Sequence, residues 1–226
     1  MAPYTELTSN RMRLFLPFLL VTFVAVLPAA AQSSSALPAP ECLYAEELAP
    51  VDDYMRLITF GDPYKGTFDA DVTVIEYFDP NCPHCKTMHP VMERVIADRG
   101  EKARFFMVPF VLWQYSLLQT EALFVAGQDG KYFEMLEAQY ERQQPGGLGM
   151  DELVDIASQI GLDPVVFRSR VEQGMNQNMI LARRQEIANL GVRGTPSVMI
   201  NGRFIDGGSK SYACIVQFID EAAAGE

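Results

Sequence analysis

The chain has 226 residues, enough for one well-buried domain or for one domain with a large insertion. Hydrophobic residues make up 49% and charged residues 21%, which is typical of a globular protein and excludes a disordered one. The formal net charge of −11 argues against nucleic acid or an anionic membrane surface as a partner.

The first 31 residues have the pattern of a secretory signal peptide. Arg11 and Arg13 precede an apolar run over residues 14–26, and a small-x-small sequence ends at Ala31. The alternative is an uncleaved membrane anchor. We expect cleavage near Ala31, because the apolar run is marginal for spanning a bilayer and Pro17 interrupts it. The product is then expected in the periplasm or secreted, in an oxidising compartment.

The next segment, residues 32–60, is predicted to be a flexible N-terminal leader. Residues 32–50 are rich in Ser, Ala and Pro, a composition typical of mobile segments. Residues 52–59 fit either a short helix or an edge strand, and the pattern does not decide between them. Glycines and a proline between residues 61 and 66 predict a loop before the first regular element.

A strand, a helix and a second strand are predicted next. Residues 72–78, with the sequence Val-Thr-Val-Ile-Glu-Tyr-Phe, have the apolar character of a buried central strand. An amphipathic helix opens at Cys82, and Gly100 is placed to end it. Residues 104–110 form the second strand candidate. The order strand-helix-strand implies a parallel pair with a right-handed crossover.

From residue 113 to residue 190 the chain is predicted to be helical throughout. The best-marked start is Asp163-Pro164, a capping acid followed by proline at the first helical position. The predicted helices lie near residues 116–126, 131–143, 150–160, 164–174 and 176–190.

After Gly191 the β pattern returns. Asn201-Gly202 separates two short apolar runs, and this dipeptide suits the tight turn of a hairpin whose strands twist normally. An amphipathic helix is predicted over residues 212–223. The predicted order is therefore βαβ, a helical insertion, and ββα, which is an α/β class of fold.

Two cysteines, Cys82 and Cys85, flank Pro83-His84 where the predicted helix begins. The positive end of the helix dipole favours a thiolate there, and the thiolate is the nucleophile of disulfide chemistry. A closed zinc site needs four ligands, whereas the chain has only two histidines and two other, distant cysteines. The pattern therefore favours a redox pair over a metal site.

These motifs resemble those of the DsbA-type thiol:disulfide oxidoreductases of the thioredoxin superfamily. The resemblance rests on Cys82-Pro83-His84-Cys85 after an apolar strand and on Gly194-Thr195-Pro196 before a hairpin, and it runs over roughly residues 61–221. It implies a thioredoxin fold built from residues 61–112 and 188–226, with residues 113–187 as an inserted helical domain.

The resemblance also implies roles for the motif residues. Cys82 is expected to attack and Cys85 to resolve the mixed disulfide, while Pro83 and His84 tune the reduction potential. The redox-active Cys82–Cys85 disulfide would be the only redox group, with no separate cofactor or metal.

In this family the second motif holds a cis-proline opposite the cysteine pair. Pro196 is expected to be that proline, with the Thr195 backbone offered to an extended substrate strand. Thr occurs before this proline in isomerase-like members, which weakens an assignment as a pure oxidase.

Glu76 lies six residues before Cys82, where thioredoxin-type proteins keep a buried acid beneath the active site. Such a carboxylate could take the proton of Cys85 during resolution, the alternative being a strand residue that turns to solvent. His89 is interpreted as an ordinary helix residue.

Cys42 and Cys214 remain. The N- and C-terminal elements of a thioredoxin-type domain can be neighbours, so a structural disulfide between them is one option. Two inert thiols, or a bond from Cys42 to another chain, are the others, since sequence does not give connectivity.

The favoured function is a periplasmic or secreted dithiol oxidase that passes its disulfide to folding proteins. Its expected partners are cysteine-containing secreted proteins and a membrane redox partner. An isomerase or reductase of the same superfamily is the first alternative, and a module that binds copper(I) through the cysteine pair is the second.

Overall fold

A five-stranded mixed sheet forms the centre of the computed structural model, which describes residues 41–59 and 61–225. Strand β2 (Val72–Phe78) lies in the middle, parallel to β3 (Ala103–Pro109) and antiparallel to β4 (Ser197–Ile200). The edges are β1 (Tyr64–Gly66) and β5 (Arg203–Phe204). Every residue of β2 is buried, as the apolar sequence predicts for a central strand.

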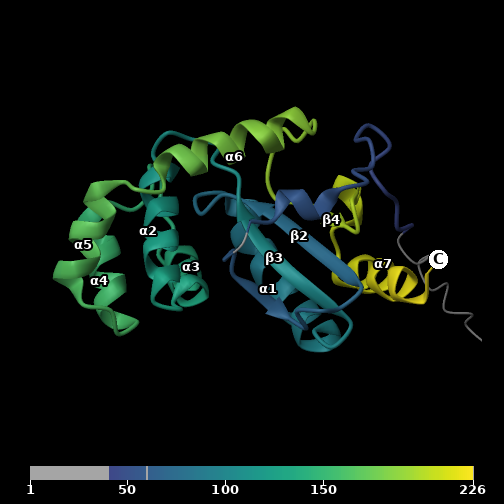
Figure 1. Cartoon of the computed structure of the whole chain (residues 1–226), viewed down its shortest axis with the longest axis horizontal. Helices are drawn as coiled ribbons and strands as arrows, with labels where there is room; N and C mark the ends of the chain where they lie inside the picture. The colour runs from purple at the N-terminus through teal and green to yellow at the C-terminus, as the bar shows by residue number, and fades with distance from the viewer. Residues whose placement is uncertain (1–40, 60, 226) are drawn as a thin grey trace, which may run out of the picture. The chain divides into compact units, whose positions relative to one another are not determined.

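The described part of the chain has seven α-helices (Figure 1). Helix α1 connects β2 to β3, so the predicted parallel crossover is confirmed. Helices α2 to α6 all lie between β3 and β4 in the sequence, and α2 to α5 form a group at one end of the sheet. The helices are α1 (Pro83–Arg99), α2 (Ser116–Gln128), α3 (Tyr132–Glu141), α4 (Met150–Gln159), α5 (Pro164–Gln173), α6 (Gln177–Asn189) and α7 (Tyr212–Ala224).

The two faces of the sheet carry separate apolar layers. Val72 and Val74 pack with side chains of α1 and α7. Ile75 and Tyr77 point to the other face, where they pack with Ile187 of α6 and with the N-terminal segment. Since side chains alternate along a strand, Glu76 shares the face of Val74, the face that α1 covers.

The helices α2 to α5 have a core of their own. Its fully buried members come from all four helices and include Leu123, Met135, Leu136, Leu153, Ile156 and Phe167. Asp163 accepts hydrogen bonds from the N–H groups of Val165 and Val166, so the predicted capped start of α5 is confirmed. Both cysteines of the motif also belong to this core, which places them where the helical group meets the sheet.

The hairpin predicted from Asn201-Gly202 is confirmed between β4 and β5. Both turn residues have positive φ, 43° at Asn201 and 84° at Gly202, as the tight turn requires. A Cβ at Gly202 would lie 2.2 Å from the carbonyl oxygen of Val51, so a side chain has no room there. The Asn201 side chain also accepts a hydrogen bond from the N–H of Thr73 at 2.7 Å, joining the turn to β2.

Residues 41–59 are packed on the domain, which corrects the expected flexible leader for this part of residues 32–60. Tyr44 forms a bridge with Ile205, and the N–H of Ala45 donates to Phe204 of β5. The physical reason is that β5 is a sheet edge, whose unpaired backbone groups favour an added strand-like segment. Farther along, residues 54–57 form the short 3₁₀ helix η1 (Tyr54–Leu57), with Leu57 buried.

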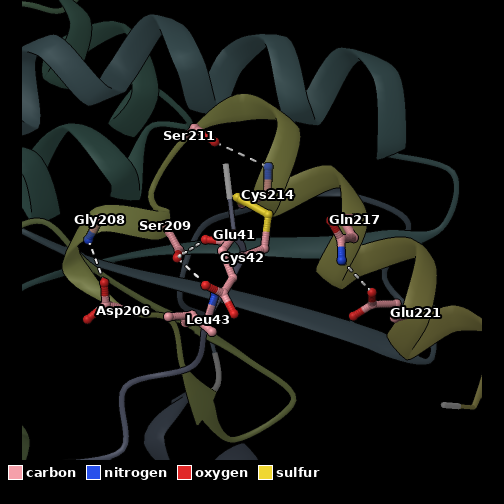
Figure 2. Close-up of a disulfide and its surroundings, with 10 residues drawn as sticks. All are labelled: Glu41, Cys42, Leu43, Asp206, Gly208, Ser209, Ser211, Cys214, Gln217 and Glu221. Carbon is pink, nitrogen blue, oxygen red and sulfur yellow. Dashed lines mark hydrogen bonds between the residues drawn. A yellow bond between two sulfur atoms is a disulfide. The ribbon is translucent and has the colours of Figure 1, made fainter. Parts of the chain in front are cut away.

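The same segment is joined to α7 by a disulfide between Cys42 and Cys214 (Figure 2). Its sulfur atoms are 2.03 Å apart, and the two residues are separated by 172 positions. The N–H of Leu43 donates to the hydroxyl of Ser209, and the Ser211 hydroxyl accepts from the N–H of Cys214 at the start of α7. Of the three options left open by the sequence, the structure has the intramolecular bond.

Strand β1 is a second difference from the sequence analysis, which placed a loop here. Its three residues pair with β3, Tyr64 opposite Phe106 and Gly66 opposite Arg104. Residues 1–40, which include the predicted signal peptide and the first part of the leader, lie outside the described residues. Among the helices of the described residues, none has the length and apolar character needed to cross a bilayer.

Candidate active site

The two motif cysteines lie at the first turn of α1. Cys82 is the N-cap residue, Pro83 takes the first helical position, and Cys85 follows within the same turn. Both cysteines are free thiols in this structure. Cys82 is 3% exposed and Cys85 fully buried, so the two side chains differ little in exposure.

The surroundings of the two thiols push their pKa values apart. A hydrogen bond from the Cys85 thiol, helped by backbone N–H groups of the first turn, lowers the pKa of Cys82 to about 5, against the opposing effect of burial. Burial is the main cause that raises the pKa of Cys85 above its ordinary value. At neutral pH the arrangement therefore favours a thiolate at Cys82 and a protonated thiol at Cys85.

The Thr195–Pro196 peptide bond is cis, and it lies against the cysteine pair. Cys82 Sγ is 3.3 Å from the carbonyl oxygen of Thr195, to which the thiol form donates. The Thr195 hydroxyl is buried, and no partner for it lies within the part of the chain that the structure describes. The two sequence motifs, 113 residues apart, thus meet at one sulfur atom.

Glu76 is 1% exposed and lies on the α1 side of β2, so the alternative that it turns to solvent is excluded. Neither of its carboxyl oxygens has a hydrogen-bond partner among residues 41–59 and 61–225. Burial is the first cause that raises its pKa to about 8, with the charges of Glu93 and Cys82 adding to it and that of Lys210 opposing it. The group is therefore mostly protonated at pH 7.

The two residues between the cysteines are exposed. His84 and cis-Pro196 both line a shallow groove. That groove is lined by His84, Thr87, Met88, Val91, Thr195, Pro196, Gly207 and Lys210. Pro83 borders a second cleft, which the stacked rings of Trp113 and Tyr115 also line. The tuning role of the His84 ring stays a prediction.

His89, interpreted from sequence as an ordinary helix residue, packs its ring against that of Tyr140 with 5.2 Å between ring centroids. Its Nδ1 and the Tyr140 hydroxyl are both buried, with no hydrogen-bond partner in the described ranges. Burial is the first cause that lowers the pKa of His89.

Asp79 organises the turn that carries Cys82, and sequence reasoning missed it. One carboxyl oxygen accepts from the N–H of Asn81 at 2.7 Å and from the Ser116 hydroxyl at 2.8 Å, and the other accepts from the N–H of Leu112 at 2.7 Å. The contact two residues ahead is an Asx turn, for which Asp before Pro80 is a fitting sequence signal. The contacts with Leu112 and Ser116, which are far from Asp79 in the sequence, join the cysteine turn to the start of the helical group.

Within residues 41–59 and 61–225 there is no group of three or more His, Cys, Asp or Glu side chains placed to hold an ion.

Comparisons with known proteins agree with this geometry. The family model described as Thioredoxin matches residues 59–221. The chain is 30% identical over 152 residues to the Na⁺/H⁺ antiporter NhaA 1 of Salinispora arenicola, a match that covers 63% of this chain and only 22% of that protein's length. It is 25% identical over 168 residues to disulfide bond formation protein D of Bacillus subtilis, covering 64% of this chain and 70% of that protein.

Solved structures show the same architecture. The crystal structure of Wolbachia pipientis alpha-DsbA1 matches with a TM-score of 0.67 and 20% sequence identity, covering 77% of this chain and 97% of that one. The family model spans well over half of the present chain. The chain therefore belongs to the thioredoxin family, and its fold is that of the DsbA-type thiol:disulfide oxidoreductases.

Proposed function

We propose that the chain is a thiol:disulfide oxidoreductase that works through Cys82 and Cys85 and donates its disulfide to other proteins. The observation that carries the proposal is the setting of Cys82 Sγ. It lies between the helix start that favours its thiolate and the Thr195 carbonyl oxygen 3.3 Å away, next to cis-Pro196.

The proposed reaction balances as a two-step exchange. A substrate thiolate attacks Cys82 Sγ of the Cys82–Cys85 disulfide, forming a mixed disulfide and releasing Cys85 as a thiolate that takes up a proton. A second substrate thiolate then attacks the substrate sulfur of the mixed disulfide, and Cys82 leaves as a thiolate. The substrate dithiol has lost two electrons, which reduce the pair, and two protons, of which one is on Cys85 and the other has gone to the solvent. The low pKa of Cys82 makes it a good leaving group in the second step.

Other residues of the site are assigned supporting roles in this proposal. Protonated Glu76 lies beneath the pair and is suited to exchange a proton with Cys85. The Thr195 backbone would pair with an extended substrate segment, and the groove beside His84 would receive side chains that flank the substrate cysteine.

We further propose that the protein works in the periplasm or is secreted, on cysteine-containing secreted proteins, with a membrane redox partner that reoxidises the pair. The Cys42–Cys214 disulfide supports this, because structural disulfides persist in oxidising compartments. The relative named disulfide bond formation protein D supports the donor direction.

The test is to trap the mixed disulfide. Reduced protein carrying Cys85→Ser, mixed with oxidised glutathione, should accumulate a glutathione adduct on Cys82 that mass spectrometry detects, because the resolving thiol is absent. The matched Cys82→Ser variant should form little adduct, since the remaining Cys85 is buried and protonated. Equal adduct on both variants, or none on either, would refute the assignment of Cys82 as the reactive sulfur.

A further inference from the structure

Lys210 is a charged residue of the groove that the exchange reaction above does not use. Its Nζ donates to the carbonyl oxygen of cis-Pro196 at 2.6 Å, a short charge-assisted hydrogen bond. The side chain is partly buried, and burial lowers its pKa. Burying an ammonium group is costly unless a hydrogen-bond acceptor replaces the lost water, and the Pro196 carbonyl is that acceptor for Lys210.

The backbone that carries Lys210 is held from several sides. It follows the short 3₁₀ helix η2 (Gly207–Ser209), whose first turn Asp206 caps through the N–H of Gly208. Ser209 is bonded to the N-terminal segment, and Ser211 caps α7 close to the disulfide (Figure 2). The lysine therefore extends from a rigid support toward the cis-proline turn.

Lys210 lines the same groove as His84, Thr195 and cis-Pro196. The groups that act on it are Cys85 and Cys82 from α1, Glu76 from β2 and Asp206 from its own loop. Glu76 is protonated at neutral pH, and Asp206 is already bonded to a backbone N–H. Because the Cys85 thiol is protonated at neutral pH, Cys82 is the member of the reactive pair whose thiolate the ammonium group can favour.

We propose that Lys210 is a positioning residue for the reactive pair: it holds the carbonyl of cis-Pro196 and keeps a positive charge in the groove that Thr195, the partner of Cys82, also lines. The proposal rests on the assignment of Cys82 as the reactive cysteine and adds a residue to it. The consequence is that the lysine favours the reduced, thiolate-bearing form and fixes the Thr195–Pro196 turn on which a substrate strand would pair.

The test is a titration of the Cys82 thiolate by its ultraviolet absorbance, in protein reduced at Cys82 and Cys85 with the other disulfide intact. Lys210→Met removes the charge and the donor, and we expect it to raise the Cys82 pKa by about half a unit to one unit, which lowers the thiolate fraction about three- to tenfold below the midpoint. Lys210→Arg keeps both features and should stay within about 0.2 units of the unmodified protein.

Lys102→Met is the matched control, because Lys102 pairs with Asp220 on the surface. This variant should also leave the Cys82 pKa within about 0.2 units of the value in the unmodified protein, since solvent and salt screen the exposed charge of Lys102. Lys210→Gln is a second charge-removing variant, expected to behave like the Met variant. The proposal would be overturned if the Cys82 pKa were unchanged in both Lys210→Met and Lys210→Gln, or if Lys102→Met raised it as much as they do. The titration needs no substrate, so its result is independent of whether the mixed disulfide of the proposed function forms.

Discussion

Replacing Glu76 with Gln should stabilise the protein at neutral pH. Gln has nearly the shape of the protonated carboxyl group but does not ionise. The pKa of Glu76 is about 8 in the folded protein and 4.5 as the ordinary value. An acid whose pKa is raised by folding contributes stability below its unfolded pKa, and that contribution is lost as the pH rises through the folded pKa.

The magnitude follows from those two values. At pH 7 the ionisable side chain makes the folded state about 3 kcal/mol less stable than a neutral one would, and at pH 4 the difference is below about 0.5 kcal/mol. The Gln variant should therefore match the parent at pH 4 and exceed it by about 3 kcal/mol at pH 7.

The assay is guanidinium unfolding at a series of pH values, in a Cys82→Ala, Cys85→Ala background so that neither thiol titrates. Glu101→Gln, at an exposed turn, is the control and should change stability by less than about 0.5 kcal/mol throughout. A stability difference for Glu76→Gln that does not change between pH 4 and pH 8, or a variant that is less stable at pH 7, would refute the reasoning that burial holds this proton.

Three further predictions concern stability. Asp79→Ala leaves three hydrogen-bond donors without their acceptor. It should lower the free energy of unfolding, measured in guanidinium, by on the order of 3 kcal/mol. A loss below about 1 kcal/mol would count against the role of Asp79 in organising the turn. Cys42→Ala with Cys214→Ala opens a long loop and should cost about 4 to 5 kcal/mol in urea unfolding, whereas a negligible loss would mean that the edge contacts alone hold residues 41–59. Asn201→Ala should cost about 1–2 kcal/mol in thermal unfolding through its positive φ and its lost bond to Thr73, and Asn201→Gly should recover the backbone part.

The parts of the fold that sequence could predict are those specified by neighbouring residues. The buried run of β2, the capped start of α5 and the Asn201-Gly202 turn each follow from a few adjacent side chains. Strand β1 could not be predicted, because its three residues carry no periodic pattern and become a strand only by pairing with β3. The packing of residues 41–59 depends on a sheet edge about 160 residues later in the chain.

The same division applies to the site. The cysteine pair and the Thr195-Pro196 dipeptide are local motifs, so their positions could be named from the sequence. The bonds of Asp79 to Leu112 and of Lys210 to the Pro196 carbonyl span 33 and 14 residues, and only the folded chain brings these groups together. The burial of Glu76 was one of two options in the sequence, and the folded chain decides it, because both faces of β2 are covered by other elements.

The most direct test of the central claim is the reduction potential of the Cys82–Cys85 pair, measured by equilibration with glutathione. A stabilised Cys82 thiolate favours the reduced form, so we expect a value near or above about −150 mV, typical of a disulfide donor. A value near about −250 mV would contradict it, because a pair at that potential is suited to reduce disulfides.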